Sequence, residues 1–209
     1  MLTLAIKAVL VAAVGYLLGS ANSSLIVGKF YGVDIRTMGS GNAGTTNTLR
    51  NLGKTAAFFV IIGDVLKGVI ACLAGLYIIG NVEGMGKLGV MLGGVSAVIG
   101  HNWPVYFGFK GGKGILTSFS VVLMMDWKIG LMLFGVFLIT VAATRYVSLG
   151  SVLASALFPV VAAIPVFHKS PAFIIFALVI SFLAIIRHRS NIERIFAGSE
   201  SKLGGKRSN

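Results

Sequence analysis

The stretch TAAFFVIIGDVLKGVIACLAGLYIIG, residues 55–80, contains only two charged side chains, Asp64 and Lys67. A helix needs roughly 20 predominantly apolar residues to cross a bilayer core, so this stretch predicts a transmembrane helix. The composition of the whole chain agrees, because 56% of its residues are hydrophobic, 11% are charged and the mean hydropathy is +0.92. Soluble domains carry about 25% charged residues. The sequence therefore predicts an all-α fold, a polytopic bundle of transmembrane helices.

Six further apolar stretches predict spans on either side of this helix. They are residues 4–30, 88–107, 115–125, 129–143, 149–167 and 172–186. The third and fourth of these six are short, and Asp126-Trp127-Lys128 between them is typical of a tight interfacial turn. We expect seven spans, with five as the alternative, and either odd count places the termini on opposite sides. No linker or low-complexity tract divides the chain, so we expect one membrane-integral domain over residues 1–209.

The basic residues predict the orientation. Most of the 18 Lys and Arg residues fall on one side of this topology, and the positive-inside rule makes that side cytoplasmic. The N-terminus is then outside and the C-terminus inside. Attraction to anionic lipid also explains basic residues in the tail. The residues on this side are Lys29, Arg36, Arg50, Lys54, Lys110, Lys113, Arg145, Arg187, Arg189, Arg194, Lys202, Lys206 and Arg207.

Three polar, glycine-rich segments emerge on the same side: residues 38–50, 100–114 and 187–200. The first contains Gly39-Ser40-Gly41-Asn42-Ala43-Gly44-Thr45-Thr46-Asn47 and ends at Arg50. Glycines let backbone N–H groups converge on an anion, and Ser, Thr and Asn can cap a helix start. The segment predicts a phosphate cradle, with an ordinary turn and cap as the alternative. It also matches G-x-G-x-x-G, but it follows a helix and not a strand, so a dinucleotide site lacks its context.

The second and third segments supply histidines and cations. His101 stands at a helix break before Pro104, and Lys110 and Lys113 lie in a glycine loop that is not a Walker motif. An interfacial histidine is more often structural than catalytic. In the third segment His188, Asn191 and Arg194 are spaced by three residues and share a helix face. A positive-inside stop after a span explains its arginines but not its His and Asn.

Together the segments resemble the bacterial acyl-phosphate-dependent glycerol-3-phosphate acyltransferase family, over nearly the whole chain. Thr45, where alanine is common, and Asn22, where proline is common, depart from the family pattern without removing a functional group. The matching motifs are Ser40-Gly41-Asn42-x-Gly44-x-Thr46-Asn47 with Arg50, Gly63-Asp64-x-x-Lys67-Gly68, Gly100-His101-x-x-Pro104 with Phe109-Lys110-Gly111-Gly112-Lys113-Gly114, Arg145-Tyr146-Val147-Ser148-Leu149-Gly150-Ser151, and Arg187-His188-x-x-Asn191-Ile192-x-Arg194 with Gly198 and Glu200.

The resemblance implies transfer of a fatty acyl group from acyl phosphate to the 1-hydroxyl of glycerol 3-phosphate, the first acylation of phospholipid synthesis, at the cytoplasmic face of a bacterial inner membrane. It implies catalytic roles for Ser40, Lys110, His188 and Asn191. No cofactor, metal, nucleic acid or obligatory protein partner is expected; membrane lipids surround the chain. The implied substrate-binding set is Ser40, Gly41, Asn42, Gly44, Thr46, Asn47, Arg50, His101, Lys110, Gly111, Gly112, Lys113, Ser148, His188 and Asn191.

Several alternatives remain at this stage. The hydroxyl proton can go to His188, to His101 or to a substrate phosphate oxygen; we favour the phosphate, because Arg187 and Arg189 should discourage a cationic His188. An anion or lipid transporter would also carry basic loops, but no internal repeat is visible. A structural lipid-binding protein would not need three different motifs. Asp64 and Lys67 are expected to form a neutralised structural pair, and Cys72 to be a packing residue.

Overall fold

The computed structural model describes residues 3–204, and this part of the chain folds into nine α-helices joined by loops and three short 3-10 helices. The all-α prediction is confirmed. The 3-10 helices are Ile35–Thr37, Val105–Phe107 and Pro165–Phe167. The α-helices are α1 Leu4–Ser20, α2 Ser23–Phe30, α3 Thr45–Ile78, α4 Leu88–Asn102, α5 Ile115–Met125, α6 Trp127–Thr144, α7 Val147–Ala162, α8 Pro171–Arg187 and α9 Arg189–Phe196.

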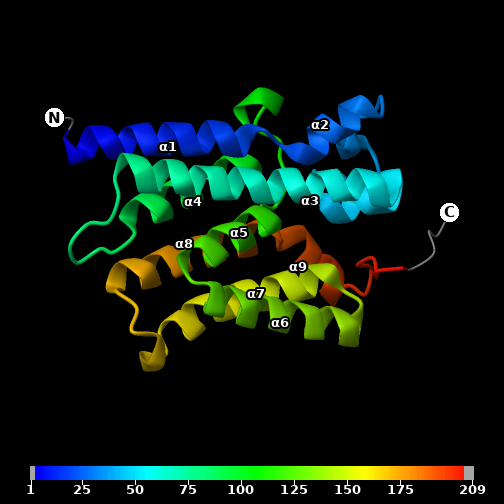
Figure 1. Ribbon diagram of the computed structural model, residues 1–209. Helices are drawn as coiled ribbons and strands as arrows, with labels where there is room; N and C mark the ends of the chain where they lie inside the picture. Colours follow the sequence, from blue (N-terminus) through cyan, green and yellow to red (C-terminus); the bar gives the residue numbers. More distant parts are fainter. Residues whose placement is uncertain (1–2, 205–209) are drawn as a thin grey trace.

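The long helices run side by side and form two groups (Figure 1). Helices α1, α3 and α4 pack against one another, and α6, α7 and α8 form the second group. Helix α5 contacts α3, α4 and α6, while α8 also contacts α4, so these two helices join the groups. Helix α1 starts at one end of the bundle and the described chain finishes at the other (Figure 1).

Glycines let α1, α3 and α4 approach one another closely. A Cβ added at Gly75 would lie 1.9 Å from the Gly89 carbonyl oxygen, and one at Gly19 would lie 2.1 Å from the Ala97 carbonyl oxygen. Small residues at such contacts are the usual basis of helix association in membranes. The backbone of α4, whose last turn carries His101, is therefore held firmly against its neighbours.

The second group has an aromatic core. Phe158 of α7 packs edge-to-face against Phe173 and Phe176 of α8, with ring centroids 6.0 Å and 5.9 Å apart. Cys72 is a free, fully buried thiol in the same core cluster, which confirms its predicted packing role.

Several helix ends differ from the predicted ones, and each has a local cause. Helix α3 runs from Thr45 to Ile78, but Gly53 (φ 86°) is non-helical and divides it into a polar first part and an apolar part. The apolar part begins beside residue 55, as predicted, whereas the polar helical part before Gly53 was not predicted. The span predicted at residues 4–30 breaks where the Asn22 side chain accepts a hydrogen bond from the Leu25 N–H and starts α2. The turn predicted between α5 and α6 is confirmed: Asp126 caps α6 by accepting from the Lys128 and Ile129 N–H groups.

The number of spans remains a prediction. By length and apolar composition, three helices of residues 3–204 could cross a membrane, or four if α8 and α9, bent by 57° at their junction, count as one span. Helices α4, α5 and α7 have 15, 11 and 16 residues, fewer than the roughly 20 of a full crossing. The tail charges Lys206 and Arg207 lie outside the described residues.

Candidate active site

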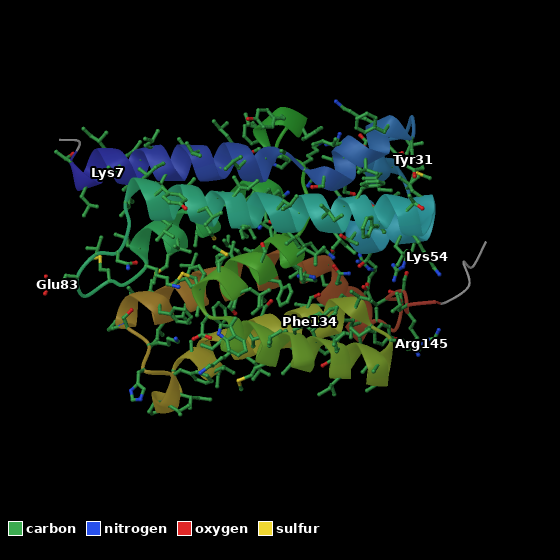
Figure 2. The ribbon with its side chains drawn as sticks, in the orientation of Figure 1. Lys7, Tyr31, Lys54, Glu83, Phe134 and Arg145 are labelled. Carbon is green, nitrogen blue, oxygen red and sulfur yellow. The ribbon has the colours of Figure 1, made fainter. Side chains whose placement is uncertain are left out.

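The three polar segments meet around a cavity of about 260 Å³. It lies toward the end of the bundle that carries Lys54 and Arg145; Lys7 and Glu83 mark the other end (Figure 2). Most of the predicted site residues line it: Ser40, Asn42, Gly44, Thr46, Asn47, Arg50, His101, Lys113, Ser148, His188 and Asn191. Four predicted residues do not line it: Gly41, Lys110, Gly111 and Gly112.

Asn47 organises the first loop. Its buried side chain donates to the Ile35 and Met38 carbonyl oxygens at 3.0 Å and 2.9 Å, and its Oδ1 accepts from the Ser40 N–H at 3.0 Å. Gly39 sits at φ 55°, a conformation that favours glycine. Asn47 thus holds Ser40 at the cavity wall.

The backbone donors of the cradle come from the start of α3. The N–H groups of Gly41 and Gly44 already donate inside the loop, to the Met38 and Asn42 carbonyl oxygens. These two glycines therefore shape the loop, whereas we expected them to donate to the ligand. The first hydrogen bond of α3 runs from the Thr48 N–H to the Gly44 carbonyl, so the N–H groups that precede it are the free donors of a helix N-terminus. That end of a helix favours anions.

Arg187 and His101 hold the second loop in place. The Arg187 guanidinium donates to the Gly111 and Gly112 carbonyl oxygens at 3.2 Å and 2.9 Å and lies over the Trp103 ring. The Gly112 N–H donates to the His101 carbonyl. Arg187 thus binds the loop backbone. Gly111 and Gly112 do not line the cavity, and they lie in the loop that positions Lys113.

The two lysines of this loop have different surroundings. Lys113 is largely enclosed and donates to Asn191 Oδ1. Burial, and secondarily the nearby Arg194, Arg187 and Arg50, lower its pKa to about 8 against the opposing effect of Glu200. Lys110 is exposed and outside the cavity lining. Its catalytic role remains a prediction.

The third segment bends at His188 and still presents its polar face to the cavity. His188 is 2% exposed, and its Nδ1–H donates to the Ala184 carbonyl oxygen at 2.7 Å. Because the carbonyl can only accept, the neutral ring carries its lone pair on Nε2. Burial, followed by Lys113, lowers the pKa of His188 to about 4. The expected neutral His188 thus owes its state mainly to burial and Lys113. Arg189 is exposed and pairs with Glu193.

Glu200 is an acidic residue of the site that the sequence interpretation left out of the binding set. Its carboxylate accepts hydrogen bonds from Ser148, Asn191 and Arg194 at 2.7, 2.6 and 2.8 Å. Burial raises the pKa of Glu200, but these hydrogen bonds outweigh it and the pKa is lowered. The sequence feature that could have identified Glu200 as a site residue is its position just after Gly198, at the end of the third motif.

A buried ionic cluster forms the floor of the cavity. Lys67 Nζ lies 2.9 Å from Asp64 Oδ1 and 2.7 Å from His101 Nδ1. The predicted Asp64–Lys67 pair is confirmed, and it extends to a third residue. Among residues 3–204 no group of three or more His, Cys, Asp and Glu side chains could hold a metal ion.

A second, apolar cavity of about 110 Å³ adjoins the first. Helices α5, α6, α7 and α8 line it, and Phe134, labelled in Figure 2, stacks on Phe119 and Phe137 at its wall. The two cavities share four lining residues: Ile115, Leu116, Phe137 and Ser151. The site thus combines a basic part suited to phosphate with an apolar part suited to a hydrocarbon chain.

The fold and the site define an all-α membrane protein with adjoining basic and apolar cavities. Comparison with known proteins identifies the class more closely. The sequence pattern of the family described as glycerol-3-phosphate acyltransferase matches residues 9–198. The chain is 48% identical over 200 residues to the glycerol-3-phosphate acyltransferase of Thermoanaerobacter sp. (strain X514), and 44% identical over 200 residues to that of Clostridioides difficile (strain 630). Each alignment covers 95% of this chain and 97% of the relative.

Two solved structures are similar over most of the chain. One is the glycerol 3-phosphate form of PlsY (YgiH), an integral membrane glycerol 3-phosphate acyltransferase, with a TM-score of 0.84 and 38% identity, covering 94% of this chain and 96% of that one. The lysphosphatidic acid form of PlsY gives a TM-score of 0.80 at 39% identity, with 94% and 95% covered. The chain belongs to the glycerol-3-phosphate acyltransferase family. It is an integral membrane acyltransferase, as the resemblance implied.

Proposed function

We propose that this enzyme transfers a fatty acyl group from acyl phosphate to the 1-hydroxyl of glycerol 3-phosphate. The products are lysophosphatidate (1-acylglycerol 3-phosphate) and inorganic phosphate. One observation carries the proposal: the basic cavity and the apolar cavity share a wall. A donor that joins a phosphate directly to an acyl chain can place each part in a matching environment. The glycerol 3-phosphate and lysphosphatidic acid forms of PlsY support the choice of acceptor and product.

The charges of the basic cavity suit two phosphate groups. Arg50, Lys113 and Arg194 line it together with the N-terminus of α3, and Glu200 balances part of this charge. Arg50 makes one hydrogen bond to the protein, from its guanidinium to the Ser201 carbonyl at 3.1 Å, so its other donors are available. A guanidinium grips phosphate through two parallel hydrogen bonds. We assign Arg50 to the phosphate of glycerol 3-phosphate.

The reaction needs little from the protein beyond positioning. The 1-hydroxyl oxygen forms an ester bond to the acyl carbonyl carbon, the bond from that carbon to the phosphate oxygen breaks, and the hydroxyl proton passes to a phosphate oxygen. Acyl phosphate already has a good leaving group, so orientation and neutralisation of the phosphate charge supply much of the rate. Lys113 is placed to neutralise the departing phosphate.

His188 suits the hydroxyl better than the phosphate. Its Nε2 carries a lone pair, since Nδ1–H is occupied by Ala184, and a lone pair repels a phosphate oxygen but accepts from a hydroxyl. We propose that His188 orients the 1-hydroxyl while a phosphate oxygen takes its proton. Asn191 is held between Lys113 and Glu200 and so keeps Lys113 in position.

We place the reaction at the cytoplasmic face of a bacterial inner membrane, in a bundle of seven spans formed by one domain. The support is the distribution of basic residues, which favours a cytoplasmic position for the end of the bundle that carries Lys54 and Arg145 (Figure 2).

The test is a donor comparison with the purified protein in lipid. Acyl phosphate with glycerol 3-phosphate should release inorganic phosphate and lysophosphatidate in equal amounts, and omission of glycerol 3-phosphate reports hydrolysis alone. Acyl coenzyme A and an acyl carrier thioester serve as rival donors. Turnover with a thioester and none with acyl phosphate would overturn the assignment of the donor.

A further inference from the structure

The cluster on the cavity floor lies deeper than the loops assigned to substrate. Asp64, Lys67 and His101 are 2%, 5% and 3% exposed. The Lys67 ammonium lies 2.9 Å from Asp64 Oδ1, 2.7 Å from His101 Nδ1 and 3.4 Å from the Ala21 carbonyl oxygen. One cation thus joins α3, the end of α4 and the break between α1 and α2.

The chemistry of Lys67 decides where His101 carries its proton. An ammonium group only donates hydrogen bonds, so Nδ1 of His101 must accept, and a neutral ring then holds its proton on Nε2. A protonated His101 would set two cations against one carboxylate, beside Arg187, in a bundle core where an unbalanced charge is costly. His101 Nδ1 also lies 3.5 Å from Asp64 Oδ1, but moving the proton from Lys67 to His101 would place it on the weaker base.

The Nε2 atom faces the place where the two ligand loops meet. A Cβ added at Gly112 would lie 2.3 Å from His101 Nε2 and 2.3 Å from the Ala43 carbonyl oxygen. Ala43 belongs to the cradle loop and Gly112 to the lysine loop. Within residues 3–204 Nε2 has no hydrogen-bond partner, although His101 lines the cavity. An N–H at the cavity wall without a partner in the protein can donate to a ligand oxygen.

We propose that Lys67 and Asp64 hold His101 as a neutral Nε2–H donor that binds a substrate phosphate oxygen at the floor of the cavity. His101 is then a binding residue and not the base, and Lys67 is a positioning residue that acts through the ring. The identity of the anion rests on the proposed function; the state of the ring does not. His188 has the opposite arrangement, with its proton on Nδ1 and a lone pair on Nε2.

Nuclear magnetic resonance of protein labelled with nitrogen-15 in its histidine rings tests the ring state directly. The chain has three histidines, and His168→Gln and His188→Gln variants assign the signals. At pH 7 we expect a proton bonded to Nε2 of His101 and none on Nδ1, and titration with inorganic phosphate should shift that N–H signal. A proton on Nδ1 of His101, or protons on both nitrogens, would overturn the proposal.

Lys67 variants test the cause. Because Lys67→Met alone would strand Asp64, the double variant Asp64→Asn/Lys67→Met removes both charges and gives a folded comparison more readily. We expect His101 of the double variant to show a mixture of both tautomers. The single variant Lys67→Arg keeps a hydrogen-bond donor beside Nδ1, so its His101 should keep the Nε2–H form. An unchanged single tautomer in the double variant would show that Lys67 does not set the ring state.

Two amide substitutions test the role in binding. Gln at position 101 places an N–H near the Nε2 position, whereas Asn places its amide near the Nδ1 position. We expect His101→Gln to keep the substrate KM within about threefold and His101→Asn to raise the KM by about tenfold or more. A kcat loss of about 10²–10⁴ in His101→Gln at unchanged KM would make His101 the base and refute the proposal.

The two proposals fail in different ways. If the wild-type enzyme does not use acyl phosphate, the proposed function fails, and the ring state and the phosphate titration still decide the role of His101. If the wild-type enzyme turns over but His101 carries its proton on Nδ1, only the present inference is lost.

Discussion

His188→Gln distinguishes a base on the protein from a base on the substrate. With its pKa lowered to about 4, His188 is neutral at pH 7 and its Nε2 lone pair is free to accept. A phosphate monoester has a second pKa of about 6, so a phosphate oxygen holds the proton more strongly than this imidazole by about two pKa units, which is a few kcal/mol. The proton should therefore go to the phosphate, while His188 orients the hydroxyl.

The expected outcome follows from this difference. A glutamine carbonyl can still accept from the hydroxyl, so we expect kcat to fall by no more than about tenfold, far less than the 10²–10⁴ that a lost general base costs. The acidic limb of kcat/KM should stay near pH 6, because the phosphate titrates there in both enzymes. A base of the pKa of His188 would place the limb near pH 4 instead.

The assay is phosphate release between pH 3.5 and 8, with kcat and KM separated at each pH. His168→Gln is the matched control, because His168 is exposed in the connection between α7 and α8 and its loss should change nothing. Size-exclusion chromatography and thermal unfolding in detergent show whether the variants are folded. Loss of the acidic limb together with a drop of about 10² or more in kcat at unchanged KM would refute substrate assistance and make His188 the base.

Three further predictions concern binding, topology and metal. Arg50→Ala removes a charged hydrogen bond worth about 1.5–3 kcal/mol, so the KM for glycerol 3-phosphate should rise about tenfold or more. Lys54→Ala is the control, because Lys54 is exposed and lies outside the cavity lining. An equal rise in KM in both variants would contradict the assignment of Arg50 to the phosphate. In a Cys72→Ser background, a cysteine at the exposed position 202 should react with an impermeant reagent only from the cytoplasmic side, and one at the exposed position 87 only from outside. The reverse result would show that the polar segments do not lie on the cytoplasmic face. Turnover should be complete in chelator, and strict dependence on added Mg²⁺ would disprove metal independence.

Apolar runs predicted the helices well, because burial in a bilayer imposes one requirement over many residues. The helix ends were predicted less well, since they depend on single residues. Hydropathy predicted the apolar part of α3 that follows the bend at Gly53, but it did not predict the polar helical part from Thr45 that precedes the bend. Hydropathy cannot show that a polar stretch continues an apolar helix.

The meeting of the three polar segments followed from topology alone, because a bundle returns alternate loops to the same end. Topology did not predict which partner each polar group of these segments binds in the folded site. Gly41 and Gly44 were expected to donate to an anion, but their N–H groups are satisfied inside the loop. Arg187 was expected only to discourage a cationic His188, yet its guanidinium also donates to the Gly111 and Gly112 carbonyls. Whether such a donor binds a carbonyl oxygen of the protein or a ligand depends on the folded conformation of the loop.

The two site histidines show most clearly what the residue type leaves open. In the sequence, both His101 and His188 are candidates for substrate binding and for accepting the hydroxyl proton, with a catalytic role implied only for His188. In the structure, Nδ1 of His101 faces the Lys67 ammonium and Nδ1 of His188 faces the Ala184 carbonyl. The first contact leaves a donor on the other nitrogen and the second leaves an acceptor. A phosphate needs the donor and an attacking hydroxyl needs the acceptor, so one cavity can orient a substrate phosphate and the attacking hydroxyl with two neutral rings.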